Sequence, residues 1–158
     1  FGINKENVEL VEPNTWVKAH ITLCISKSPH AEYINPNLIK FLKSKNPAEL
    51  DADSPKKIFI SRRDAPDRLH PREGALCNLY RDQGFDVLEL EKISISKQIN
   101  YFANANEIAG FHGAGLVNMV WCRNTVLVTE LFHNSHFQNC YFCLAEALKH
   151  RYELVHID

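Results

Sequence analysis

Residues 107–131 read EIAGFHGAGLVNMVWCRNTVLVTEL and contain two apolar runs separated by a glycine turn and a short helical pattern. The first run, Glu107 to Phe111, has the length and composition of a buried strand, and the second run covers 125–131. Between them, the apolar residues follow helical spacing up to Cys122. Strands that are joined through a helix are typically parallel neighbours in one sheet. The stretch therefore predicts a βαβ unit.

The same alternation of short apolar runs and helical patterns covers the chain from residue 56 to its end. Further strands are expected at 57–61, 85–90 and 152–157, and further helices at 71–82, from Ser94 or Ser96 to Asn104, and at 135–150. Gly84 is expected to end the first of these helices. This order of elements is typical of an α/β fold. We therefore expect a Rossmann-like parallel sheet with helices on both faces, in a domain that spans 56–158.

The first 55 residues are less regular and predict an entry segment with one strand and one helix. The strand is expected between Trp16 and Ile25, and the helix from Pro36 to Ser44, where Asn35 can cap it. Residues 46–55 are acidic, contain two prolines and predict a surface loop. We expect the entry segment and the α/β domain to form one compact unit.

The 158-residue chain is close to electroneutral, with a formal charge of −1, and 45% of its residues are hydrophobic. This balance argues against a nucleic-acid partner, which would favour a strongly basic surface. No apolar run approaches the roughly 20 residues that cross a bilayer. The five cysteines lie mostly in apolar segments, so we expect reduced thiols and no disulfide. Because the sequence begins with Phe rather than Met, we expect it to be part of a longer protein.

Side chains that can bind or react follow three of the predicted strands. Arg62 and Arg63 follow the first strand, His112 follows the strand before the glycine turn, and Glu130 lies near the end of the strand after it. The carboxyl ends of parallel strands meet at one edge of the sheet, where open α/β sheets bind their ligands. We therefore expect these side chains to form one site.

The glycine turn is the strongest indication of a ligand. Gly113 and Gly115 let a ligand approach the backbone where a Cβ atom would clash. The N–H groups of Ala114 to Leu116 begin a helix, and a helix N-terminus favours phosphate. The turn matches neither the Gly-x-Gly-x-x-Gly pattern nor a P-loop. The alternative is a tight turn whose glycines serve packing alone.

The charged residues of the predicted site also have alternative roles. We expect one of Arg62 and Arg63 to point inward and contact phosphate oxygens, the alternative being a solvated, charge-balanced loop. Glu130 is expected to hold ribose hydroxyls or to pair with one of the arginines inside the sheet. His112 is either a hydrogen-bonded structural residue or a functional one.

A set of zinc-type ligands lies near the C-terminus and consists of His133, His136, Cys140 and Cys143. On one continuous helix the first and last of these would lie about 15 Å apart, which is too far for a single ion. We therefore expect no metal at this position, and we expect both cysteines to pack inward with the neighbouring leucines.

The motif His-Gly-Ala-Gly-Leu-x-Asn at residues 112–118 resembles glycosyltransferase family 61, which includes protein O-linked GlcNAc transferases and plant β-1,2-xylosyltransferases. The resemblance covers about residues 15–150, and its weaker matches, in the right order and spacing, are Tyr33–Leu42, Lys57–Asp64, Gly84–Phe85, Leu88–Leu90, Gln98–Ile99 and Glu130–Leu131. Where the family has an Arg followed closely by Asn-Glu, this chain has Arg68-Leu-His-Pro-Arg-Glu73.

The resemblance implies a GT-B architecture, in which this chain would be the C-terminal, donor-binding half and an N-terminal domain its partner. The implied reaction is inverting transfer from a nucleotide sugar, with a uridine diphosphate (UDP) sugar as the expected donor, to a hydroxyl of a glycan, polysaccharide or protein. The isolated half need not be active. The implied general base is His112 or a residue of the other half, no metal cofactor is implied, and the donor contacts fall on Arg62, Arg63, Gly113, Ala114, Gly115, Leu116, Asn118 and Glu130.

Two other readings remain open on the residues alone. A non-catalytic nucleotide-binding or interaction module can use the same sheet and the same glycine turn. A dehydrogenase or methyltransferase can use this kind of sheet too, but the chain lacks the early glycine fingerprint of a dehydrogenase and the acidic residue that follows it.

Overall fold

The computed structural model of the chain describes residues 6, 12–13, 34–46, 51, 53–63, 70–133 and 138–157. The chain divides into two compact units, Phe1–His30 and Ala31–Asp158, and the sheet with its helices belongs to the second. The strand expected within 16–25 lies outside the described residues. The helix expected in the entry segment is present as α1 (Pro36–Lys43) and belongs to the same unit as the sheet.

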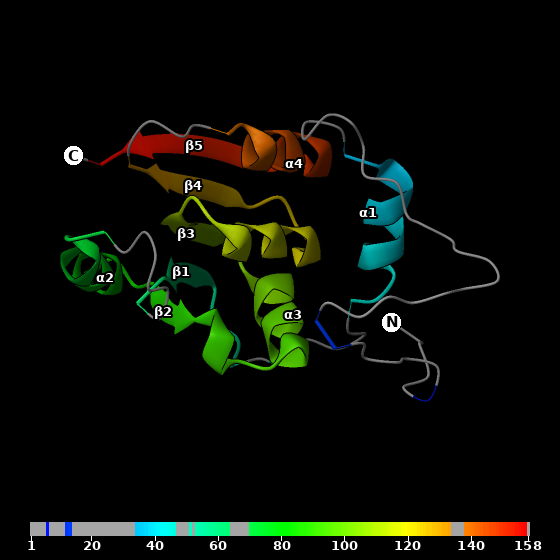
Figure 1. Ribbon diagram of the computed structural model, residues 1–158, viewed down its shortest axis with the longest axis horizontal. Coiled ribbons are helices and arrows are strands. Elements are labelled where there is room, and N and C mark those ends of the chain that lie inside the picture. Colours follow the sequence, from blue (N-terminus) through cyan, green and yellow to red (C-terminus); the bar gives the residue numbers. More distant parts are fainter. Residues whose placement is uncertain are drawn as a thin grey trace. The chain divides into compact units, whose positions relative to one another are not determined.

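The second unit contains one five-stranded parallel sheet, which confirms the expected fold class (Figure 1). Its strands are β1 (Lys57–Ser61), β2 (Asp86–Glu89), β3 (Glu107–Phe111), β4 (Leu127–Phe132) and β5 (Arg151–His156). Their order in the sheet is β2-β1-β3-β4-β5. The chain therefore reverses its direction of winding between β1 and β3, and such a switch point is where open α/β sheets form their ligand crevice.

Helices follow the strands as the sequence predicts. They are α2 (Glu73–Asp82), α3 (Ile95–Asn104) and α4 (Cys140–Leu148), with short 3₁₀ helices η2 (Leu90–Lys92) and η3 (Ala114–Trp121). Asn35 caps α1 by accepting a hydrogen bond from the Asn37 N–H at 2.9 Å. Ser94, rather than Ser96, caps α3. Gly84 follows α2 with φ of 81°, a conformation that glycine adopts without the cost of a Cβ clash.

The two faces of the sheet carry separate apolar clusters. The larger cluster packs the inward side chains of α3, η3 and α4 on alternate strand residues such as Ile58, Ile108 and Val128. The smaller cluster lies between α2 and the opposite face, around Phe59 and Phe111. Because strand side chains alternate between faces, this division assigns each strand residue to one helical layer. Helices therefore cover both faces of the sheet.

The segment after the glycine turn differs from its prediction, because η3 is a 3₁₀ helix rather than an α-helix. Its ends are closed by the tighter i→i+3 bonds, from the Leu116 N–H to the Gly113 carbonyl at 3.0 Å and from the Cys122 N–H to the Met119 carbonyl at 3.1 Å. This segment packs against α1, α3 and α4. Met119 and Trp121 are buried, as expected for core residues.

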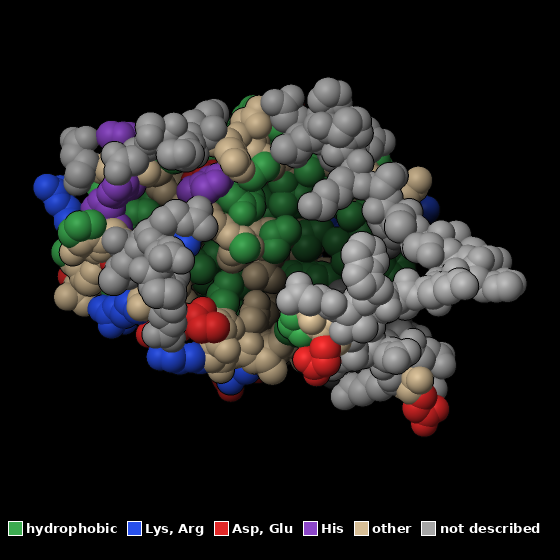
Figure 2. Space-filling model, in the orientation of Figure 1, with side chains coloured by type: hydrophobic (Ala, Val, Ile, Leu, Met, Phe, Trp, Pro, Cys, Tyr) green, Lys and Arg blue, Asp and Glu red, His purple; other side chains and the backbone are tan. Residues whose placement is uncertain are grey.

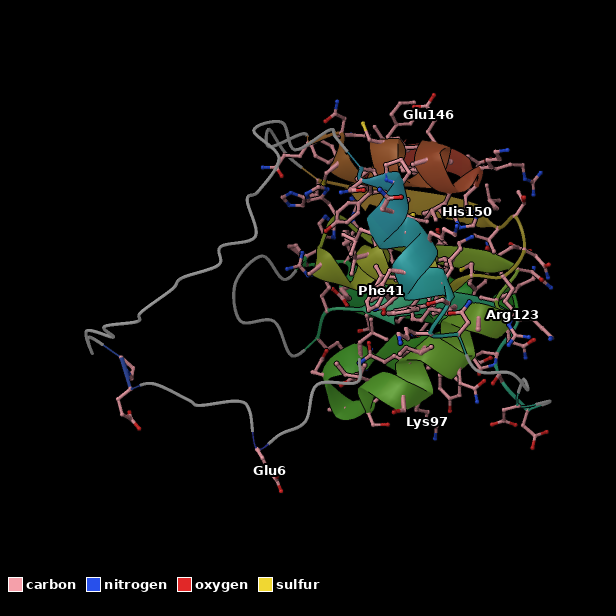
Figure 3. All side chains as sticks on the ribbon, turned by 90° about the vertical axis from the view of Figure 1, so that its right-hand side faces the viewer. Glu6, Phe41, Lys97, Arg123, Glu146 and His150 are labelled. Atoms are coloured by element: carbon pink, nitrogen blue, oxygen red, sulfur yellow. The ribbon has the colours of Figure 1, made fainter. Side chains whose placement is uncertain are left out.

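The end of the domain opposite the carboxyl ends of the strands is closed by α1 and His150 (Figure 3). His150 accepts a hydrogen bond from the Val126 N–H at Nδ1, 3.4 Å away, and its Nε2 lies 3.1 Å from the Met119 carbonyl oxygen. The Asn46 side chain, just after α1, donates to the Trp121 carbonyl at 2.9 Å. Among the described residues, no helix is long and apolar enough to cross a membrane.

The cysteines differ partly from expectation. Cys77 and Cys122 are buried, whereas Cys140 and Cys143 are half-buried and do not pack fully into the core. Both lie in the first turn of α4, whereas the buried leucines of that helix lie further along it. The thiols of Cys77, Cys122 and Cys140 are not joined in disulfides, and Cys24 lies outside the described residues.

Candidate functional site

The candidate site lies at the carboxyl ends of β1, β3 and β4, on both sides of the switch point. Ile60 is the register partner of Gly110, so Arg62 and His112, each two residues further along the chain, leave the sheet next to each other. Phe111 is the partner of Leu131, so the end of β4 lies on the other side of β3. Histidine side chains gather on the side of the domain toward which β4 and β5 point, and Lys and Arg side chains border them (Figure 2). The strand ends therefore bring basic and imidazole groups together.

Arg62 is the arginine that points into the site. Its Nη1 donates a hydrogen bond to the main-chain carbonyl of His112 at 2.8 Å. Arg63 is exposed and extends over the start of α2, where its Nη2 would lie 3.9 Å from a Cβ atom at Gly74. The two adjacent guanidinium groups thus have separate surroundings, and only Arg62 spans the switch point.

Glu73 holds the backbone that carries Arg62. Its Oε1 accepts hydrogen bonds from the Arg62 N–H and from the Ser61 hydroxyl, the latter at 2.8 Å. The residue is only 2% exposed, and its Oε2 has no hydrogen-bond partner among the described residues. The sequence reasoning did not single out this side chain. The acidic residue at the start of the helix that follows the Arg62–Arg63 pair is the signal that could have found it.

The absence of a side chain serves a different purpose at each of the two glycines of the turn. A Cβ atom at Gly113 would lie 3.2 Å from Nη1 of Arg62, so the missing side chain makes room for the guanidinium group. A Cβ atom at Gly115 would lie 2.9 Å from Cγ2 of Ile60 and 3.1 Å from Cδ1 of Leu90. Gly115 is therefore a packing glycine, because a side chain at this position would collide with the core behind it.

The backbone N–H groups of the turn are only partly available. The Leu116 N–H donates to the Gly113 carbonyl, so, contrary to the expectation, it is not free to bind a ligand. Within the described part of the chain, the N–H groups of Ala114 and Gly115 have no carbonyl partner. A 3₁₀ helix leaves its first N–H groups unpaired just as an α-helix does, and these two groups can therefore donate hydrogen bonds to an anion.

The side chain of Asn118, the last residue of the glycine motif, makes hydrogen bonds to other parts of the protein. Its Nδ2 donates to the Gly115 carbonyl at 3.1 Å and to Oε1 of Gln98 at 3.3 Å, and its Oδ1 accepts from the Trp121 indole N–H at 3.2 Å. In this arrangement the side chain ties η3 to α3. Direct contact between Asn118 and a donor stays a prediction.

His112 and Glu130 form a hydrogen-bonded pair. Glu130 is 1% exposed, and its Oε1 forms a hydrogen bond with Nδ1 of His112. Its Oε2 accepts a hydrogen bond from the hydroxyl of Tyr152 in β5. Burial raises the pKa of the Tyr152 hydroxyl, and the bond to Glu130 raises it further, so this hydroxyl keeps its proton and remains a donor.

Glu130 thus has two partners in the described residues, and neither is an arginine. Sequence reasoning missed Tyr152, because its contact with Glu130 depends on β5 lying beside β4. Contact between Glu130 and a ribose stays a prediction, although both carboxyl oxygens already have partners inside the protein.

A second histidine lies close to the strand ends. His70 is buried and stacks on Phe111 with a centroid distance of 5.2 Å, and its Nδ1 accepts from the Arg72 N–H at 3.1 Å. The ring of His133 meets it edge-on at 4.6 Å. Burial, followed by the proximity of His133, lowers the pKa of His70. His70 is therefore a neutral packing residue beside the site at neutral pH.

No metal centre emerges from the described residues, which contain no group of three or more His, Cys, Asp or Glu side chains that could hold an ion. Of the zinc-type set in the sequence, Cys140 and Cys143 lie in α4, His133 contacts His70, and His136 lies outside the described residues.

Comparison with known proteins places this geometry in a family. The family model Glycosyltransferase 61 matches residues 10–129, which include the whole glycine turn, both arginines and Glu73. No curated protein matches the chain. The match covers most of the chain and agrees with the parallel sheet and with the motif at 112–118. The chain therefore belongs to the Glycosyltransferase 61 family.

Proposed function

We propose that this chain forms the donor-binding part of an inverting glycosyltransferase that takes its sugar from a nucleotide sugar, with UDP as the nucleotide. Membership of the Glycosyltransferase 61 family supports sugar transfer. The observation that carries the finer proposal is the arrangement at the switch point, where Arg62 is held beside the turn that exposes two backbone N–H groups. A guanidinium group and helix N–H groups are the donors that a diphosphate requires.

In the proposed reaction these donors act on the leaving group. As the bond between the anomeric carbon and the donor phosphate oxygen breaks, its electron pair leaves with the nucleoside diphosphate. Arg62 and the N–H groups of Ala114 and Gly115 stabilise this negative charge without reorganising, because the fold already fixes them. In this mechanism the fixed positive charges do the work that a divalent ion does elsewhere, and we expect binding without added metal.

The acceptor side of the reaction needs a proton acceptor. The acceptor hydroxyl oxygen forms a new bond to the anomeric carbon from the face opposite the leaving group, and its proton must go to a base. We assign this role to His112, whose Nε2 lies on the ring edge facing away from buried Glu130. A second domain, as in a GT-B enzyme, would supply most contacts to the glycan, polysaccharide or protein acceptor.

Titration and turnover test this proposal. Calorimetry with UDP, uridine and NAD, each with and without a chelator, should show binding of UDP that persists on chelation. Release of UDP from UDP-N-acetylglucosamine or UDP-xylose, with the anomer of the product read by NMR, tests transfer and inversion. UDP binding without any sugar release or transfer by the full-length protein would support the non-catalytic module instead. Binding of NAD alone would contradict the proposal, and loss of UDP binding on chelation would shift it to a metal-dependent site.

A further inference from the structure

The inference concerns how His112 is held, and it rests on the function proposed for this site. We propose that Glu130 and Tyr152 are positioning residues that keep the proton of His112 on Nδ1, so that Nε2 is the atom that accepts the proton of the acceptor hydroxyl. Both residues lie beyond residues 10–129, the part of the chain that matches the family model. Neither needs to contact the substrate in order to act.

The sheet brings these three side chains to one face. Glu130 is the register partner of Gly110, and His112 lies two residues after Gly110, so His112 leaves β3 on the face of Glu130. Tyr152 is the partner of Val128, which lies two residues before Glu130 on the same face. Diagonal neighbours on adjacent strands are within reach of a long aromatic side chain. The parallel order β3-β4-β5 therefore assembles the cluster.

The hydrogen bonds define which nitrogen carries the proton. A carboxylate only accepts hydrogen bonds, so the group that faces Oε1 of Glu130 must donate, and that group is Nδ1 of His112. The hydroxyl of Tyr152 donates to Oε2, and this second hydrogen bond fixes the orientation of the carboxylate. In neutral His112 the proton is thus on Nδ1, and Nε2 carries a lone pair.

Burial gives the pair a second effect. Glu130 is 1% exposed, whereas the side chain of His112 is 20% exposed. A buried carboxylate is costly unless a positive charge lies beside it. When Nε2 takes a proton, the imidazole becomes that positive charge, so Glu130 stabilises the product of the proton transfer. This is the logic by which the carboxylate of a Ser-His-Asp triad orients and stabilises its histidine.

The packing around the ring supports a fixed orientation. The ring of Tyr141, in α4, meets the His112 ring with centroids 5.1 Å apart. The main-chain carbonyl of His112 is held by Arg62 at 2.8 Å. Both the backbone and the ring of this residue are therefore restrained before any substrate arrives.

The test uses Glu130→Gln and Tyr152→Phe in the full-length protein. Glutamine has nearly the shape of glutamate but no negative charge, and its NH₂ group can donate to Nδ1 and reverse the tautomer. The Phe variant removes only the bond to Oε2. Glu107→Gln, at the other end of β3, and Tyr80→Phe, in α2, are the matched controls. Melting curves accompany each variant.

Kinetics provide the first measurement. We expect kcat for sugar transfer to fall about 100-fold in Glu130→Gln and roughly tenfold in Tyr152→Phe, while the KM for the donor and the Kd for UDP change less than about twofold. The controls should keep the kcat of the parent. A fall in UDP and uridine affinity with little change in kcat would overturn the inference in favour of a ribose contact by Glu130. Unchanged kcat in both variants would also overturn it.

Imidazole NMR provides a measurement that does not depend on activity. Long-range ¹H–¹⁵N spectra of neutral His112 should show a protonated Nδ1 and an unprotonated Nε2 in the parent, and a mixed or reversed tautomer in Glu130→Gln. An Nε2–H tautomer in the parent would overturn the inference even if sugar transfer is found. If the parent shows the Nδ1–H tautomer but neither binds UDP nor transfers sugar, the proposed function fails while the hydrogen-bonded arrangement of His112 stands.

Discussion

Arg62 donates a hydrogen bond from Nη1 to the main-chain carbonyl of His112, 2.8 Å away, and so joins the ends of β1 and β3 at the switch point. Gly113 leaves room for this bond, because a Cβ atom at that position would lie only 3.2 Å from the same nitrogen. The arginine, the glycine turn and the histidine are therefore one structural unit. Changes in this unit and in the residues that support it should have separable effects on nucleotide binding, stability and turnover.

Arg62→Ala should weaken the binding of UDP by about 1.5–3 kcal/mol, the usual worth of a hydrogen bond to a charged group. Uridine lacks the diphosphate, so its binding should change little. Arg63→Ala is the matched control, because its guanidinium extends over α2. Calorimetric titration of both variants with both ligands measures the effect. A larger loss in Arg63→Ala than in Arg62→Ala would show that the wrong arginine has been assigned.

Gly115→Ala should lower the free energy of unfolding by about 1–3 kcal/mol, as overpacking of a core commonly does. The added Cβ would lie 2.9 Å from Cγ2 of Ile60, inside the closest normal contact. Gly74→Ala is the control, since its added Cβ would lie no closer than 3.9 Å to Nη2 of Arg63, and alanine favours the helix. Urea unfolding of both variants provides the comparison. Equal stability of the two would contradict the packing role of Gly115.

Glu73→Ala should destabilise the domain by about 1–3 kcal/mol, because the Ser61 hydroxyl and the Arg62 N–H would lose their shared acceptor. It should also weaken UDP binding, since the backbone of Arg62 is no longer held. Glu73→Gln keeps an oxygen at this position and should lose less in both measurements. Glu91→Ala, at an exposed position in η2, is the control. Full UDP affinity in Glu73→Ala would separate this residue from the site.

Acidification should destabilise the domain through His150. Burial lowers the pKa of His150 below its ordinary value near 6.5. The unfolded chain therefore binds more protons than the folded one between the lowered pKa and about 6.5, and stability rises with pH through this window. The contribution is complete above about 6.5 and is lost as pH falls, by at most about 1.4 kcal/mol per pH unit.

Melting temperatures between pH 5 and 8 measure this dependence. We expect a shallower slope in His150→Gln than in the parent, because only the parent carries the buried imidazole at this position. His70, whose pKa is also lowered by burial, should account for part of the slope that remains. An unchanged slope in His150→Gln would contradict the assignment.

Local patterns were sufficient for much of the fold. The strand at Glu107–Phe111 has the bounds that its apolar run predicts, and Asn35 and Gly84 mark helix boundaries where their chemistry requires them. These features depend on residues adjacent in the chain: an apolar run, a side chain that can accept from an N–H two residues on, and a residue free to adopt positive φ. The parallel sheet follows, because strands joined through helices pair in parallel.

The contacts that define the site needed the tertiary structure. The inward position of Arg62 uses the space that Gly113 leaves in the turn after β3, and the partners of Glu130 depend on which strands flank β4 and in what register. The packing role of Gly115 likewise depends on Ile60 lying behind it. Sequence spacing determines which residues reach the edge of the sheet. Only the packing of the strands and helices decides which of them touch, because side-chain direction after a strand end is set by the neighbours that it meets.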